Sequence, residues 1–137
     1  EFCKYVKNSE PTSFALVPAD IDNTESTKTL VRSDGKIAMF VTKRDLTSEE
    51  KTDFGFGGEA IGFFKLSFEN CKKFIEHYEN FESKYVELLW EIPLTDFAKS
   101  VDLSVWSITQ GPGCFEIDTQ DDYEQALLIF RKYRDSF

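Results

Sequence analysis

Residues 54–67, FGFGGEAIGFFKLS, contain four glycines among aromatic and aliphatic residues. An apolar run of this length, bounded by turn residues, is typical of a buried strand. Glycine within a strand usually marks a bulge or a close approach by another backbone. Ser67 can cap a helix that continues to about Glu79, because a serine side chain accepts hydrogen bonds from the first helical turn. The stretch therefore predicts a strand, irregular at its glycines, that leads directly into a helix with the apolar face Phe68, Cys71, Phe74, Ile75 and Tyr78.

The residues before this stretch predict further strands. SFALV, residues 13–17, is short and apolar, as expected of a buried strand. Two alternating runs flank Asp34-Gly35, a pair that suits the positive φ angles of a tight hairpin turn. The charged residues 43–53 are expected to form an exposed loop or a short helix.

The residues after this stretch alternate between helix and strand patterns. We expect a helix over 83–90, and Pro93 then suits the first turn of another short helix. Residues 101–107 and 114–118 predict two strands that join the strand at about 57–66 in one sheet. A last helix over 119–135 should pack on that sheet through Tyr123, Ala126, Leu127 and Phe130, after a capping-box-like start at Thr119 and Asp122. The fold class is therefore α/β, a mixed sheet with flanking helices.

The amino-acid composition limits which binding partners and which cellular compartment are expected for the chain. The 137 residues suit a single domain, and 25 acidic against 16 basic residues give a net charge of −9. Nucleic acid and anionic membrane surfaces are disfavoured as partners, because both require a basic face. No apolar run is long enough to span a membrane, and the first residues lack the apolar centre of a signal peptide. Three widely spaced cysteines form no metal or disulfide pattern, which indicates a cytoplasmic protein.

Glu116 and Asp118 lie two residues apart in the strand expected at 114–118, so their side chains share one face. Two carboxylates at a strand end repel each other unless a cation lies beside them. Mg²⁺ suits this arrangement, because it prefers oxygen ligands and bridges carboxylates to phosphates. The alternative is that Asp118 stabilises the start of the following helix and Glu116 is merely solvated.

Three other residues or pairs are candidates for substrate binding. Trp90-Glu91 places an aromatic face beside an acid, the chemistry that holds an ammonium group; the alternative is a core tryptophan. Glu59, with Phe54 and Phe56, borders the glycine-rich strand and is a candidate for the opposite wall, although core packing is the better interpretation of the phenylalanines. Lys43 ends a hairpin strand, where a solvated lysine is the simpler interpretation.

Four segments in this order resemble a known family: GGEAIGFFKLS, YVELLWEIPL, VDLSVWSI and FEIDTQDDYEQAL. Together they resemble the C-terminal half of the sugar nucleotidyltransferase superfamily, and within it the bacterial choline-phosphate cytidylyltransferases and their relatives that act on phosphonates. The resemblance covers the chain from about Ser13 onward. It implies that this sheet is the C-terminal part of a Rossmann-like nucleotidyltransferase domain. No loop of the family's triphosphate-binding type occurs, so we expect residues 1–137 to lack the nucleotide-binding N-terminal half and to be inactive alone.

The resemblance also implies roles for the candidate residues. Asp118 matches a magnesium ligand, and Glu116 matches an acid that faces the head group of the acceptor. Trp90-Glu91 matches a pair that lines the acceptor pocket, and a lysine at the position of Lys43 reaches the acceptor phosphate in the wider superfamily.

The reaction implied is transfer of CMP from CTP to a phosphocholine-like or phosphonate acceptor, with Mg²⁺ as cofactor. The expected partner is the N-terminal half of the same enzyme or a second copy of the chain. Three alternatives stay open: a sugar-phosphate nucleotidyltransferase, a non-catalytic interaction or dimerisation module, and an unrelated α/β domain.

Overall fold

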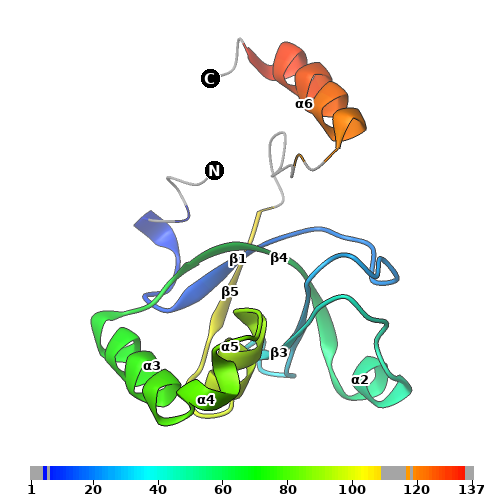
Figure 1. The fold of residues 1–137 in the computed structure, drawn as a ribbon. Helices are drawn as coiled ribbons and strands as arrows, with labels where there is room; N and C mark the ends of the chain where they lie inside the picture. The colour runs from blue at the N-terminus through cyan, green and yellow to red at the C-terminus, as the bar shows by residue number, and fades with distance from the viewer. Residues whose placement is uncertain (1–4, 6, 109–116, 118, 135–137) are drawn as a thin grey trace.

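The computed structural model describes residue 5, residues 7–108, residue 117 and residues 119–134. Within these ranges the strands form one five-stranded sheet in the order β3-β2-β4-β1-β5 (Figure 1). β1 and β5 pair in parallel, whereas the other three neighbouring pairs are antiparallel. The predicted α/β class with a mixed sheet is thereby confirmed. The strands are β1 (Ser13–Val17), β2 (Lys28–Val31), β3 (Ile37–Val41), β4 (Gly55–Lys65) and β5 (Ser104–Ser107).

β4 is the glycine-rich strand, and it is irregular where the sequence predicts. Its pairing register with β2 shifts between Thr29 and Leu30. Gly58 has φ +125° and lies so close to β1 that a Cβ atom there would be 2.6 Å from the Val17 carbonyl oxygen. Only glycine allows this approach, because any larger residue would overlap a neighbouring backbone.

The hairpin and the first helix also form as expected. β2 and β3 pair in antiparallel fashion, and Gly35 in the turn between them has φ +77°. The charged segment contains the short helix α2 (Ser48–Asp53). Thr47 and Glu50 close a capping box at its start, which satisfies two backbone N–H groups.

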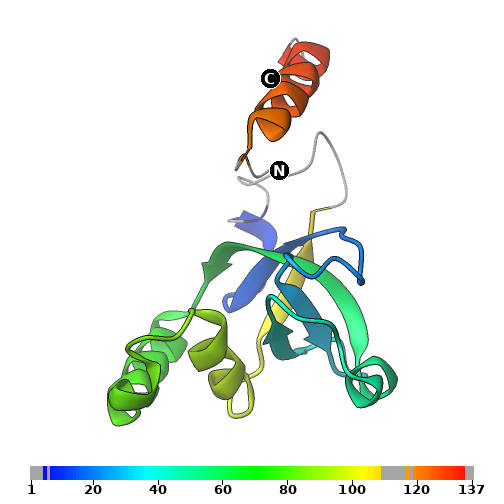
Figure 2. The ribbon, with the colours of Figure 1, turned by 45° about the vertical axis from the view of Figure 1, so that its right-hand side comes forward.

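Three helices lie on one side of the sheet: α3 (Phe68–Asn80), α4 (Glu82–Tyr85) and α5 (Glu91–Ala98) (Figures 1 and 2). α5 lies directly on β3, where the Thr95 hydroxyl accepts a hydrogen bond from the Phe40 N–H at 2.9 Å. The main core fills the space between α5 and the sheet. It contains Phe14, Leu16, Ile37, Phe40, Ala60, Leu94, Phe97, Ala98 and Leu103.

Two predictions about these helices need correction. α3 is capped by Ser67 as expected, but Phe68 is 78% exposed and Ile75 49% exposed, because α3 meets α4 and α5 rather than the sheet. The helix expected over 83–90 ends at Tyr85 and a second one begins at Glu91. Pro93 explains the break, since it has no N–H to donate to the Leu89 carbonyl, which instead accepts from Ile92 at 3.1 Å. Pro93 then lies in the first turn of α5, as expected.

The side chains of β1 point alternately to the two faces of the sheet and are buried on both. Phe14 and Leu16 belong to the core under α5, while Ala15 and Val17 pack on the other face with Tyr5 and Ile108. All five residues of β1 are buried. β1 is therefore an interior strand.

The last helix, α6 (Gln120–Tyr133), starts with the predicted capping box between Thr119 and Asp122. Its expected packing on the sheet is wrong: Figures 1 and 2 show α6 beyond the face opposite α5, and Tyr123 and Phe130 are 48% and 58% exposed. Tyr5 and Ile108, rather than α6, pack on this face of β1. The predicted strand 114–118 lies outside the described residues except for Ile117, which belongs to no strand. None of the helices in the described ranges is long and apolar enough to cross a membrane.

Candidate functional site

A cavity of about 870 Å³ opens at the end of the sheet where β1 and β3 finish. Four of the predicted substrate-binding residues line it together: Lys43, Glu59, Trp90 and Glu91. They come from the loop after β3, from β4 and from the start of α5, so they meet only in the folded chain. The two other predicted site residues, Glu116 and Asp118, lie outside the described residues.

Glu91 is the most constrained of the four. Its side chain is only 5% exposed, and its Oε1 accepts a hydrogen bond of 3.0 Å from the Thr27 hydroxyl. Thr27 Oγ1 in turn lies 3.2 Å from Thr42 Oγ1. Glu91 Oε2 is buried and has no hydrogen-bond partner within the described part of the chain. A buried carboxylate oxygen without a donor costs about 1–3 kcal/mol, so a hydrogen bond from a donor would stabilise this oxygen.

Trp90 precedes Glu91 and is held by other aromatic rings. Its indole lies 5.6 Å from the Phe40 ring in an edge contact and 6.2 Å from the Phe64 ring in a stacked one. The hydrogen bond between Phe40 and Thr95 fixes α5 against β3 beside this cluster. Trp90 therefore agrees with both interpretations made from the sequence, a core tryptophan and a pocket residue, because it packs against the core and also lines the cavity.

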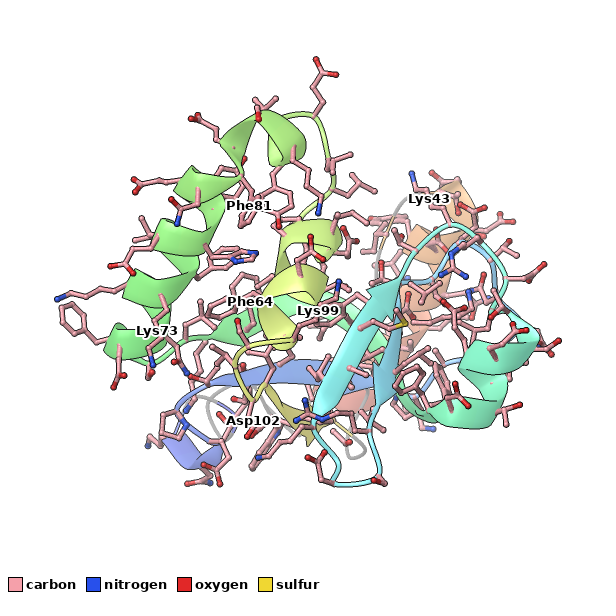
Figure 3. The ribbon with its side chains drawn as sticks, turned by 90° about the horizontal axis from the view of Figure 1, so that it is seen from below. Lys43, Phe64, Lys73, Phe81, Lys99 and Asp102 are labelled. Carbon is pink, nitrogen blue, oxygen red and sulfur yellow. The ribbon has the colours of Figure 1, made fainter. Side chains whose placement is uncertain are left out.

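Lys43 follows β3 in an unusual backbone conformation. Its φ of 51° is the only positive value among the described residues other than glycine, and Figure 3 shows Lys43 in the loop beyond the strand. The next residue anchors this loop: the fully buried Lys28 donates a hydrogen bond of 3.2 Å from Nζ to the Arg44 carbonyl. The Arg44 guanidinium contacts both carboxylate oxygens of Glu50, at 2.8 and 2.6 Å, and lowers the Glu50 pKa to about 2. These contacts hold Lys43 at the cavity.

Glu59 follows Gly58 on β4 and is half-buried. The close approach of Gly58 to Val17 fixes the backbone that carries Glu59, and Val17 also lines the cavity. Phe54 and Phe56 pack with Leu30, Val41 and Leu46, as the core interpretation predicts.

A hydrogen-bond network joins α4 to α5. The Tyr85 hydroxyl donates a hydrogen bond of 2.9 Å to Asp96 Oδ2. Burial, together with the neighbouring Asp96 carboxylate, raises the pKa of Tyr85 to about 12. Hydrogen bonds from Lys84 and Lys99 hold the pKa of Asp96 well below its ordinary value. The network ties α4 to the second half of α5.

Several cavity residues were not predicted from the sequence as binding residues. Asp122 was predicted only as a helix cap, a role the structure confirms, and it also lines the cavity. Thr27 and Thr42 carry no motif, and their position beside Glu91 follows from strand pairing alone. The polar segment before β2 is the one signal that sequence reasoning overlooked; it contributes Asn23, Glu25, Ser26 and Thr27.

The charge of the lining is strongly acidic. Glu25, Glu59, Glu91 and Asp122 line the cavity, with Lys43 as the basic residue of the described lining. No group of three or more histidine, cysteine or acidic side chains within the described ranges is placed to hold a metal ion. Asp118, the predicted magnesium ligand, lies outside the described residues.

Comparison with known proteins identifies the fold. No family model matches the chain, and no curated protein sequence matches it. Among solved structures, the CTP:phosphocholine cytidylyltransferase of Streptococcus pneumoniae is similar, with a TM-score of 0.61 and 17% sequence identity over 88% of this chain. The chain has a cytidylyltransferase-like fold. It spans 49% of the length of that protein, and at this identity the similarity establishes the fold alone.

Proposed function

We propose that this chain forms the acceptor-binding part of a magnesium-dependent nucleotidyltransferase that transfers CMP from CTP to a small phosphocholine-like or phosphonate acceptor. The observation that carries the proposal is the gathering of Lys43, Glu59, Trp90 and Glu91 around one cavity. These residues lie up to 48 positions apart in the sequence, and the sequence alone predicts each of them as a binding residue. The cytidylyltransferase-like fold supports the same reaction class.

The two ends of such an acceptor find complementary groups in the cavity. Lys43 is the cation for the phosphate or phosphonate end, and its loop is held by Lys28 and Glu50. Trp90 and Glu91 offer an aromatic face and a carboxylate to the cationic end. The cavity thereby orients the acceptor so that one phosphate oxygen points out toward the nucleotide, and orientation of this kind is a large part of catalysis.

The reaction itself requires no covalent intermediate. An acceptor oxygen attacks the α-phosphorus of CTP, the bond to the β-phosphate breaks, and pyrophosphate leaves. Mg²⁺ would neutralise phosphate charge when bound, with Asp118 as its proposed ligand and Glu116 facing the acceptor.

The test is an assay of CMP transfer by the protein in its natural full length. With CTP, Mg²⁺ and a cationic phosphate or phosphonate acceptor, we expect equimolar cytidylylated product and pyrophosphate. Asp118→Asn should keep the fold, since asparagine also suits a helix start, and should lose most of the turnover. Near-normal transfer by Asp118→Asn across a magnesium titration would contradict the metal assignment, and transfer to no acceptor would contradict the proposed function.

A further inference from the structure

The cavity carries an inference about its ligand that rests on the proposed function and goes beyond it. We infer that the cationic end of the acceptor is a primary ammonium group rather than a quaternary one. The two groups have the same charge and differ in whether they can donate hydrogen bonds, so the polar atoms of the cavity distinguish them.

Glu91 provides the main argument. Its side chain is 5% exposed, Oε1 is satisfied by Thr27, and Oε2 has no donor within the described residues. A primary ammonium carries three N–H donors and can satisfy Oε2. A trimethylammonium group has no N–H, so it would leave this buried oxygen unpaired. A site built around a hydrogen bond rejects analogues that cannot make it far more strongly than a site built on shape.

The aromatic content of the lining supports the same conclusion. Quaternary ammonium groups are typically recognised by cages of several aromatic rings. Trp90 is the one aromatic residue of the described cavity lining, and its ring already packs against Phe40 and Phe64. Polar and acidic side chains occupy much of the remaining wall. Such a wall offers hydrogen-bond acceptors rather than ring faces.

The charges of the cavity lining favour a positive group at the end of the cavity that holds Glu91. The described lining holds four acidic residues, Glu91 among them, and one basic residue, Lys43, so its formal charge favours a positive group. A compact ammonium group, which accepts several oxygen neighbours at different positions, fits the arrangement.

The experiment is a calorimetric titration of the 137-residue chain with 2-aminoethyl phosphate and its N-methyl, N,N-dimethyl and N,N,N-trimethyl derivatives, in EDTA. The charge at neutral pH stays positive through the series while the number of N–H donors falls from three to none. We expect the Kd to rise along the series, by about tenfold or more between the first and last members. Equal or tighter binding of the trimethyl compound would overturn the inference and leave the proposed function standing. Binding of none of the four would overturn both.

Glu91→Gln tests the origin of the preference. The variant removes the charge and one acceptor position, so we expect weaker binding of 2-aminoethyl phosphate and loss of most of the preference over the trimethyl compound. Glu87→Gln is the matched control, because Glu87 is exposed and is not part of the cavity lining. It should keep the unaltered order of affinities. A full preference retained by a folded Glu91→Gln would overturn the assignment; if that variant does not fold, the series on the unaltered chain decides the matter alone.

Discussion

Gly58→Ala is expected to destabilise the chain through a backbone overlap next to the cavity. The added Cβ would lie 2.6 Å from the Val17 carbonyl oxygen, which cannot rotate away as a side chain would. The φ of +125° adds backbone strain of about 1–3 kcal/mol for any residue other than glycine. Overpacking of this kind costs a further 1–3 kcal/mol, roughly. The free energy of unfolding should therefore fall by about 2–6 kcal/mol.

Gly62→Ala is the control, because it separates the overlap from the strain. Gly62 lies on the same strand with φ +73°, and a Cβ there would have no atom within 4 Å. It should lose only about 1–2 kcal/mol, the cost of the left-handed conformation. Urea unfolding followed by circular dichroism measures both values. Equal losses in the two variants would refute the argument that the approach of β4 to Val17 is what requires glycine.

Two further predictions concern pH. The Glu50 pKa is lowered by Arg44 from 4.5 to about 2, so this ion pair stabilises the fold above pH 4.5 and is lost as the pH falls toward 2. Glu50→Gln, which keeps the capping geometry, should lower the urea midpoint at pH 7 but not near pH 2. A difference in midpoint between the variant and the unaltered chain that does not change with pH would contradict this prediction. Burial raises the Tyr85 pKa from 10.0 to about 12, so its stabilising contribution is complete below pH 10 and disappears as the pH rises toward 12. Ultraviolet titration should show one late-ionising tyrosine that Tyr85→Phe removes, and its persistence in that variant would contradict the assignment.

The parts of the fold that local chemistry determines could be predicted from the sequence. The turn at Asp34-Gly35, the cap at Ser67 and the capping box at Thr119 each depend on residues a few positions apart. The burial of α3 and α6 could not be predicted in the same way. Helical periodicity identifies an apolar face, but it does not show whether another element lies against that face, and Phe68 and Phe130 remain exposed.

In the candidate site, too, some features depend on neighbouring residues and could be predicted, whereas others depend on long-range packing and could not. The Trp90-Glu91 pair and Lys43 could be recognised because each combines charge with a position at an element boundary. The contact between Glu91 and Thr27 joins residues 64 positions apart and depends on how the start of α5 lies beside the segment before β2. Lys28 has the pattern of an exposed lysine in a strand, yet it is fully buried, because the loop after β3 folds over it. Long-range packing of this kind leaves no local signal in the sequence.

A two-dimensional ¹H–¹⁵N NMR titration of the chain with 2-aminoethyl phosphate tests the binding cavity most directly. We predict that the largest shift changes fall on the Trp90 indole N–H and on the backbone amides of Thr27, Thr42 and Gly62, which surround the cavity of about 870 Å³. Changes confined to the smaller cavity of about 270 Å³ near Gly57 and Ser107, or no changes at saturating ligand, would contradict the proposed site.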